Sequence, residues 1–228
     1  MEHKTTKPIV IALDGPAGSG KSTVAKEVAK RLGFVYLDTG AMYRSLTLKA
    51  LRSGVDLNNE AKLITLARQT IIDLQIGKDH ALKVFLDGAD VTEDIRTPEV
   101  TNHTFYVARV GGVREIMVAR QRTIGEQANV IAEGRDIGTV VFPHAYRKFY
   151  LDANFEERAN RRFKEMKQKG TTVESSAVQK DLQERDTKDF TRQVGPLKKA
   201  DDAIVIDSTH LSIQDVVQKI IDSIEAHE

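Results

Sequence analysis

The chain has 228 residues, of which 40% are hydrophobic and 29% are charged, a composition typical of a globular protein. This length suits one α/β domain with a small inserted subdomain. The net charge of only +1 gives no global reason to expect a nucleic-acid or membrane partner. The sequence has no cysteine, which excludes disulfides and cysteine-ligated metals and fits a reducing, cytoplasmic location.

The first elements predicted along the chain are a strand, a glycine-rich loop and a helix. The run Ile9–Leu13 predicts the strand, and the apolar face from Val24 to Leu32 predicts the helix. Between them, "DGPAGSGKST" contains Gly15, then four residues, then Gly20-Lys21-Ser22. This spacing between a strand and a helix is typical of a phosphate-binding loop.

The residue types in this loop indicate a nucleoside triphosphate with Mg²⁺. Glycines let successive N–H groups approach one anion, Lys21 is placed to reach the β- and γ-phosphates, and the Ser22 hydroxyl can ligate Mg²⁺ directly. Asp14 and Glu133 both lie at predicted strand ends, and either can bind the ion through water. The residues expected to contact the donor nucleotide are Gly15, Pro16, Ala17, Gly18, Ser19, Gly20, Lys21, Ser22 and Thr23.

The next stretch of the chain predicts a strand, two helices and a small antiparallel insert. Short runs with intervening turns replace the helical pattern in the insert, which we expect at 71–95. "TPE" at Thr97 then predicts a helix start. The predicted elements are a strand at Phe34–Gly40, helices at Met42–Ser53 and Asn59–Thr70, and insert turns at Gly77-Lys78-Asp79 and Asp87-Gly88.

The C-terminal half repeats strands and helices. Five strands that alternate with helices predict a parallel, doubly wound sheet with helices on both faces. Ligands of such sheets bind beyond the carboxyl ends of the strands, so we expect the loops after Leu13, Asp38, Ala132, Asp152 and Asp207 to converge. The predicted elements are strands at Asn129–Gly134, Arg147–Ala153 and Asp202–Ser208, and helices at 155–169, at 173–188 and after Ser212.

Five motifs, in order, resemble those of bacterial cytidylate kinases over nearly the whole chain: "LDGPAGSGKST", "LDTGAMYR", "EGRDIGTVVFP", "LDANFEER" and "QERDTKDFTRQVGPL". The resemblance implies a single P-loop kinase domain with an NMP-binding region at 39–114 and a short helical lid within 155–192. It also implies that the γ-phosphoryl group of ATP passes to CMP or dCMP with Mg²⁺, in pyrimidine nucleotide metabolism. No exposed apolar stripe is evident, so we expect a monomer.

The resemblance also implies which residues hold the acceptor. The fork of arginine suits phosphate oxygens, a carboxylate can accept from the N4 amino group of cytosine, and an arginine can donate to its N3 and O2. Because Arg185 and Asp189 are four residues apart, a plain ion pair on one helix is the alternative for them. The implied sets are Arg44, Arg135 and Arg192 for the CMP phosphate, Thr39, Arg114 and Asp136 for cytosine, and Arg185 and Asp189 for the sugar hydroxyls.

The motif "EERANRRF" lies where nucleoside monophosphate kinases carry a mobile lid. Lid arginines neutralise the transferring group, so we expect Arg158 and Arg162 to act with Lys21 in catalysis, although the sequence does not single out one arginine from Arg158, Arg161 and Arg162. A solvated basic face is the alternative. The chain departs from the family at Phe105, beside Thr104, where members often carry a small hydroxyl residue.

The alternatives to a cytidylate kinase are a GTPase switch and a kinase for another small acceptor. A GTPase switch needs an Asn-Lys-x-Asp base reader after a core strand, and this tetrapeptide does not occur. A kinase for another small acceptor, such as shikimate, thymidylate or uridylate, would have the same fold. The base-reading residues separate that alternative from a cytidylate kinase.

Overall fold

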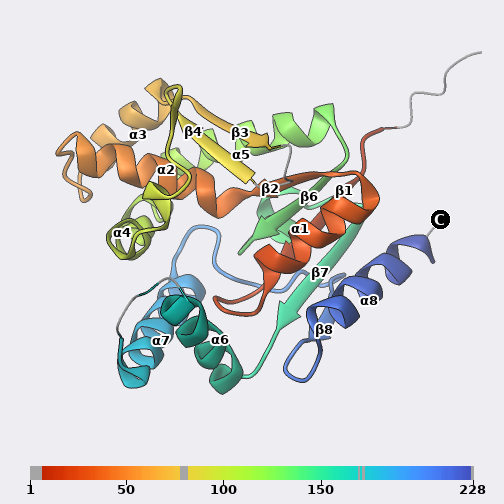
Figure 1. Ribbon diagram of the computed structural model, residues 1–228. Coiled ribbons are helices and arrows are strands. Elements are labelled where there is room, and N and C mark those ends of the chain that lie inside the picture. Colours follow the sequence, from red (N-terminus) through yellow and green to blue (C-terminus); the bar gives the residue numbers. More distant parts are fainter. Residues whose placement is uncertain (1–6, 78–81, 169, 171–172, 227–228) are drawn as a thin grey trace, which may run out of the picture.

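The protein is built around a five-stranded parallel sheet, as predicted. The computed structural model describes residues 7–77, 82–168, 170 and 173–226. The strand order is β2-β6-β1-β7-β8, and every neighbouring pair is parallel (Figure 1). The strands are β1 (Val10–Asp14), β2 (Val35–Asp38), β6 (Val130–Gly134), β7 (Arg147–Asp152) and β8 (Ile204–Asp207).

Helices cover both faces of this sheet, which explains the continuous apolar runs of its central strands. One core joins Ile11, Leu13 and Ile131 to helices α1 (Lys21–Leu32) and α8 (Ile213–Glu225). The other core joins the alternate residues, such as Ala12 and Ala132, to helices on the opposite face. Those helices are α2 (Thr39–Arg52), α3 (Glu60–Gln69) and α5 (Gly111–Gln127), with a π-helical turn, η2 (Ile137–Val141).

Several element boundaries differ from the sequence prediction by a few residues. Helix α2 begins at Thr39 and not at Met42, because the Asp38 carboxylate accepts a hydrogen bond from the Ala41 N–H at 2.7 Å and caps the helix. Helix α5 follows α4 (Pro98–Ala108) after a break at Arg109 and Val110. The sequence analysis predicted neither the start of α5, which begins with two glycines, nor the π-helical turn.

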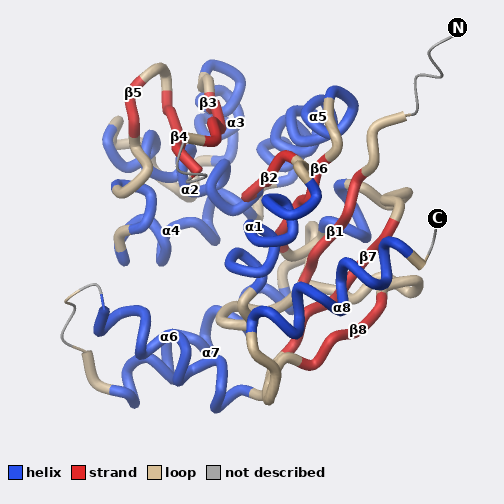
Figure 2. Tube along the Cα trace, turned by 45° about the vertical axis from the view of Figure 1, so that its right-hand side comes forward, coloured by secondary structure: helices blue, strands red, loops and turns tan. Residues whose placement is uncertain are grey.

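The predicted antiparallel insert is present. It consists of β3 (Ile72–Ile76), β4 (Leu82–Leu86) and β5 (Ala89–Asp90), and the turn η1 (Asp94–Arg96) leads on to α4. Lys78 and Asp79, where the first turn was predicted, lie outside the described residues. Figures 1 and 2 place the insert beside α2 and α3, on one side of the carboxyl ends of the strands.

Helices α6 (Phe155–Gln168) and α7 (Ser175–Thr191) form a two-helix arm on the other side of those strand ends (Figure 2). The arm packs onto the glycine-rich loop, where Ala17 lies in one buried cluster with Ala159 and Leu182. Among the described residues, no helix has the length and apolar character needed to span a bilayer.

Candidate active site

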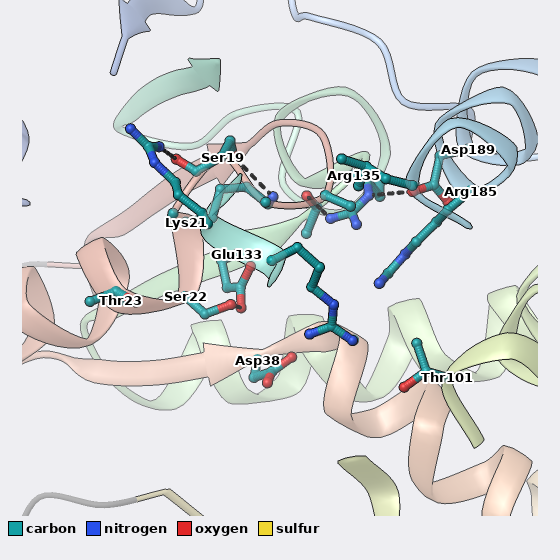
Figure 3. Close-up of a pocket in the computed structure, with 18 of the residues that line it drawn as sticks. Ser19, Lys21, Ser22, Thr23, Asp38, Thr101, Glu133, Arg135, Arg185 and Asp189 are labelled. Atoms are coloured by element: carbon teal, nitrogen blue, oxygen red, sulfur yellow. Dashed lines mark hydrogen bonds and ion pairs between the residues drawn. The ribbon is translucent and has the colours of Figure 1, made fainter. Parts of the chain in front are cut away.

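A cavity of about 1020 Å³ opens at the carboxyl ends of the strands, between the insert side and the α6–α7 arm. The loops after β1, β2, β6 and β8 contribute lining residues, as expected for a doubly wound sheet, whereas residues 153–154, in the loop after β7, are not among them. Figure 3 shows the Lys21, Glu133 and Arg185 side chains converging on this space from different elements. More cationic than carboxylate side chains line the cavity, so it favours an anionic ligand.

The glycine-rich loop holds the conformation that an anion cradle requires. Gly15, Gly18 and Gly20 have φ values of 151°, 76° and 94°, which side chains rarely tolerate. A side chain at Gly15 would collide with the Leu151 carbonyl, and one at Gly18 would lie 2.9 Å from the Arg158 carbonyl oxygen. The loop therefore packs directly against β7 and α6, and its residues 17–23 line the cavity.

Lys21 is a buried cation at the first position of α1. Its Nζ donates to the Pro16 carbonyl at 2.7 Å and to Ser19 Oγ at 3.3 Å. Burial, with the nearby Arg135 guanidinium, lowers the pKa of Lys21 to about 7. An anion bound in the loop would offset both effects.

Ser22 and Glu133 form the pair that suits a hard cation. Ser22 Oγ donates to Glu133 Oε1 at 2.5 Å, and the Tyr36 hydroxyl donates to the same oxygen at 3.0 Å. In the sheet, Glu133 is opposite Leu13, so its side chain points to the face covered by α1. A hydroxyl and a carboxylate are ligands that Mg²⁺ prefers. These two residues fit a Mg²⁺ site.

Asp14 points to the opposite face of the sheet, and both of its carboxylate oxygens already accept hydrogen bonds from the backbone. Its two carboxylate oxygens accept hydrogen bonds from the Ile137 and Gly138 N–H groups, at 2.8 and 2.7 Å. Burial raises the pKa of Asp14 to about 6. Of the two acids that the sequence left open, the geometry therefore favours Glu133.

Three of the predicted acceptor residues meet where α7 faces the strand ends. Arg135 Nε donates to Asp189 Oδ2 at 2.6 Å, so Asp189 pairs across to the loop after β6. The predicted alternative, an ion pair with Arg185 on the same helix, is not the pairing that the structure has. Burial and the nearby Arg135 lower the pKa of Arg185 to about 10, and Figure 3 shows its guanidinium facing the cavity. Crowded cations of this kind favour a phosphate.

Thr39 is the first residue of α2, and Arg44 lies five residues further along the same helix. Both line the cavity. Arg44 NH2 donates to Asp38 Oδ2 at 2.9 Å, and the Thr39 hydroxyl donates to the Glu133 carbonyl at 2.8 Å. The Tyr43 hydroxyl is buried and has no hydrogen-bond partner among the described residues, and Tyr43 lines the cavity. The sequence analysis did not predict this polar group, because Tyr43 lies among apolar residues of its helix.

A second charged cluster lies deeper in the cavity. Arg114 and Asp136 are both nearly fully buried and form an ion pair, and Arg192 NH2 lies 3.5 Å from Asp136 Oδ1. The Arg114 guanidinium is also 5.5 Å from the centroid of the Tyr43 ring. The structure thus brings together the two charged residues predicted to read a base. Phe105 and Thr104 line the same cavity.

The arginines of α6 separate into three environments. Arg162 lines the cavity and pairs with Glu165 at 2.7 Å. Arg161 also lines it and donates to the Ser208 carbonyl at 2.6 Å. Arg158 is buried behind the glycine-rich loop and is not among the cavity residues, so the structure does not bring it to the place that a catalytic role requires.

Comparison with known families accounts for this arrangement. The sequence model described as cytidylate kinase matches residues 11–226. The chain belongs to the cytidylate kinase family. It is 53% identical over 224 residues to the protein named cytidylate kinase from Desulforamulus reducens, with 98% of both chains covered. It is 49% identical over 219 residues to the one from Bacillus subtilis, with 96% of this chain and 97% of that one covered.

A solved structure of an uncharacterized protein from Eubacterium ventriosum has a similar fold. Its TM-score to this cytidylate kinase family member is 0.51 at 14% identity, and the match covers 96% of this chain and 99% of the other. This likeness concerns the fold alone.

Proposed function

We propose that this protein transfers the γ-phosphoryl group of ATP to CMP or dCMP. The observation that carries the proposal is that one cavity holds both the phosphate loop and the Arg114–Asp136 pair. Donor and acceptor phosphates must meet in line with their charge neutralised, and a shared cavity lined by cations provides both conditions. Within the single kinase domain, residues 39–114 would bind the monophosphate and 155–192 would form the lid.

The donor would bind along the phosphate loop, residues 15–23. Its N–H groups and the N-terminus of α1 would hold the phosphate oxygens, and Lys21 would neutralise the group in transfer. Arg162 lies on the lid side of the cavity and would add a second positive charge to that group. The Arg158 side chain, which is directed away from the cavity, has no such role in this proposal.

The acceptor would bind between α2, the loop after β6 and α7. Arg44, Arg135 and Arg192 would hold its phosphate, and Arg185, which lies near Arg135, would add positive charge to that phosphate and, with Asp189, hold the sugar. Arg114 would donate to N3 and O2 of cytosine, and Asp136 would accept from N4, with Thr39 beside them. The depressed pKa values of Arg185 and Arg192, both caused first by burial, support an anionic ligand at this position.

Ser22 would ligate Mg²⁺, and Glu133 would hold it through water. When bound, Mg²⁺ would neutralise negative charge that develops on the phosphate groups during transfer. Glu133→Gln should raise the Mg²⁺ concentration for half-maximal activity by roughly 10-fold, because it removes the negative charge of the carboxylate beside Ser22. A magnesium titration at saturating nucleotides measures this shift.

The control for the metal experiment is Glu126→Gln, an exposed residue of α5. It should leave the magnesium requirement unchanged. An equal requirement in Glu133→Gln and wild type would assign Glu133 to the hydrogen bonds with Ser22 and Tyr36 only.

The acceptor is tested with a panel of compounds at saturating Mg-ATP. CMP and dCMP should give the highest kcat/KM, ahead of UMP, dTMP, AMP and shikimate. Highest turnover with any of the other four would reject the proposed acceptor. The monomeric state stays a prediction, which light scattering after gel filtration measures.

Arg44→Ala should raise KM for CMP about 10-fold and leave KM for ATP nearly unchanged. Arg44 lies at the acceptor side, and a charge-assisted phosphate contact is worth about 1.5 kcal/mol or more. Steady-state kinetics with each nucleotide varied in turn measures both constants. Arg68→Ala, an exposed arginine of α3, is the matched control. A rise in KM for ATP alone would place Arg44 at the donor.

A further inference from the structure

Arg158 is the one predicted catalytic cation that is not among the cavity residues, yet its side chain donates hydrogen bonds to three acceptors. It is 8% exposed, and its aromatic neighbour Phe155 lies 5.6 Å from the guanidinium. Nε donates to the Ala153 carbonyl at 3.1 Å. NH1 donates to the Ala17 carbonyl at 3.0 Å and to Asp186 Oδ2 at 2.6 Å.

The bond to Ala17 acts on the phosphate loop from behind. Because a trans peptide is planar, holding the Ala17 carbonyl fixes the direction of the Gly18 N–H, which points the opposite way. Gly18 also packs against α6, since a Cβ there would lie 3.1 Å from Arg158 Cβ. The N–H groups of the loop are the groups proposed to hold phosphate, so their orientation affects donor affinity.

The bond to Asp186 reaches the acceptor side. Asp186 lies on α7, next in sequence to Arg185 and one turn before Asp189, which line the cavity. Its carboxylate is 6% exposed, and Oδ1 has no hydrogen-bond partner among the described residues. Arg158 is therefore a polar link between α7 and the Ala17–Gly18 peptide, beside the apolar contact that Leu182 of α7 makes in the cluster with Ala17.

We propose that Arg158 is a positioning residue that fixes the Ala17–Gly18 peptide and, through Asp186, couples the donor loop to the acceptor helix α7. This inference rests on the proposed function, because it takes ATP as the donor and CMP as the acceptor. A buried ion pair that serves the fold alone would stabilise the arm without linking the two binding events.

Two conservative variants separate these roles. Arg158→Lys keeps the charge, but a single ammonium lacks the planar fork that serves three acceptors. Asp186→Asn keeps the volume and leaves the Arg158–Ala17 bond in place. Exposed residues of the same helices provide matched controls, Asn160→Ala on α6 and Lys180→Ala on α7.

Calorimetry with the magnesium complex of a non-hydrolysable ATP analogue, with and without CMP, measures the coupling. In the wild type, CMP should tighten binding of the analogue. Arg158→Lys should weaken binding of the analogue about 10-fold and leave the affinity of the free protein for CMP within about twofold of the wild-type value. Asp186→Asn should bind each ligand alone nearly as wild type does but lose the mutual enhancement. Both controls should keep it.

Two results would overturn the proposal. One is wild-type affinity and enhancement in both variants. The other is an equal loss of affinity for the analogue and for CMP, accompanied by a fall in Tm. That result would mean that Arg158 only stabilises the fold. If instead the wild-type protein bound the analogue but phosphorylated neither CMP nor dCMP, the proposed function would fail, and the Arg158 link would still be measured by the analogue titrations.

Discussion

Lys21→Met should lower kcat by a factor on the order of 10² or more. Lys21 Nζ donates hydrogen bonds to the Pro16 carbonyl and to Ser19 Oγ, within the loop that would hold the donor phosphates. A charge aimed at the transferring group acts where charge develops, so its loss raises the barrier more than it weakens binding. Methionine has nearly the length of lysine and tolerates burial, so the variant should keep its fold. Single-turnover measurements of phosphoryl transfer give the chemical step directly.

The matched control is Lys30→Met, an exposed lysine on the same helix. It should turn over at the wild-type rate. The Tm of Lys21→Met should equal or exceed that of the wild type, because burial makes the charged ammonium costly. Near wild-type turnover in Lys21→Met would refute the role assigned to the phosphate loop.

The phosphate loop was predictable because its signal is local. A fixed spacing of glycines, lysine and serine between a strand and a helix determines the loop geometry over ten residues. The five-stranded sheet was predictable for a related reason, since each buried strand is a short apolar run with a helix after it. Both depend on neighbours in sequence.

The choice between Asp14 and Glu133 was not predictable, because it depends on pairing between strands far apart in the chain. Leu13 is opposite Glu133, and Asp14 is opposite Gly134. A one-residue difference in register sends two side chains to opposite faces of a sheet. Both acids end strands at the same edge, yet only Glu133 meets Ser22.

The role of Arg158 was not predictable for a similar reason. Arg158 and Arg162 lie four residues apart on α6, and the motif alone gives them equal standing. The two side chains point in different directions because Arg158 donates a hydrogen bond to Asp186, which is on another helix and 28 residues away in sequence. Tyr43 shows the converse case, in which a residue among the apolar residues of its helix lines the cavity and carries a buried hydroxyl without a hydrogen-bond partner among the described residues.

Asp136→Asn should lower the ratio of kcat/KM for CMP to that for UMP by a factor corresponding to roughly 1–3 kcal/mol. Cytosine presents an amino donor at N4, whereas uracil presents an acceptor at O4. A carboxylate can only accept, so it favours cytosine and opposes uracil lone pair to lone pair. The asparagine amide can rotate and donate to O4, which removes the repulsion while the side-chain volume stays the same.

The surroundings of Asp136 make asparagine a better choice than alanine. Arg114 pairs with Asp136 in a nearly fully buried position, and Arg192 lies 3.5 Å away, so a truncated side chain would leave two buried guanidinium groups without their carboxylate partner. Measurements of kcat/KM for CMP and UMP at saturating Mg-ATP, with the exposed Asp201→Asn as control, give the ratio. Equal losses for both acceptors would mean that Asp136 serves only to hold Arg114 in place. The choice of base would then depend on the guanidinium of Arg114 and the hydroxyl of Thr39, of which the latter is already committed to the Glu133 carbonyl.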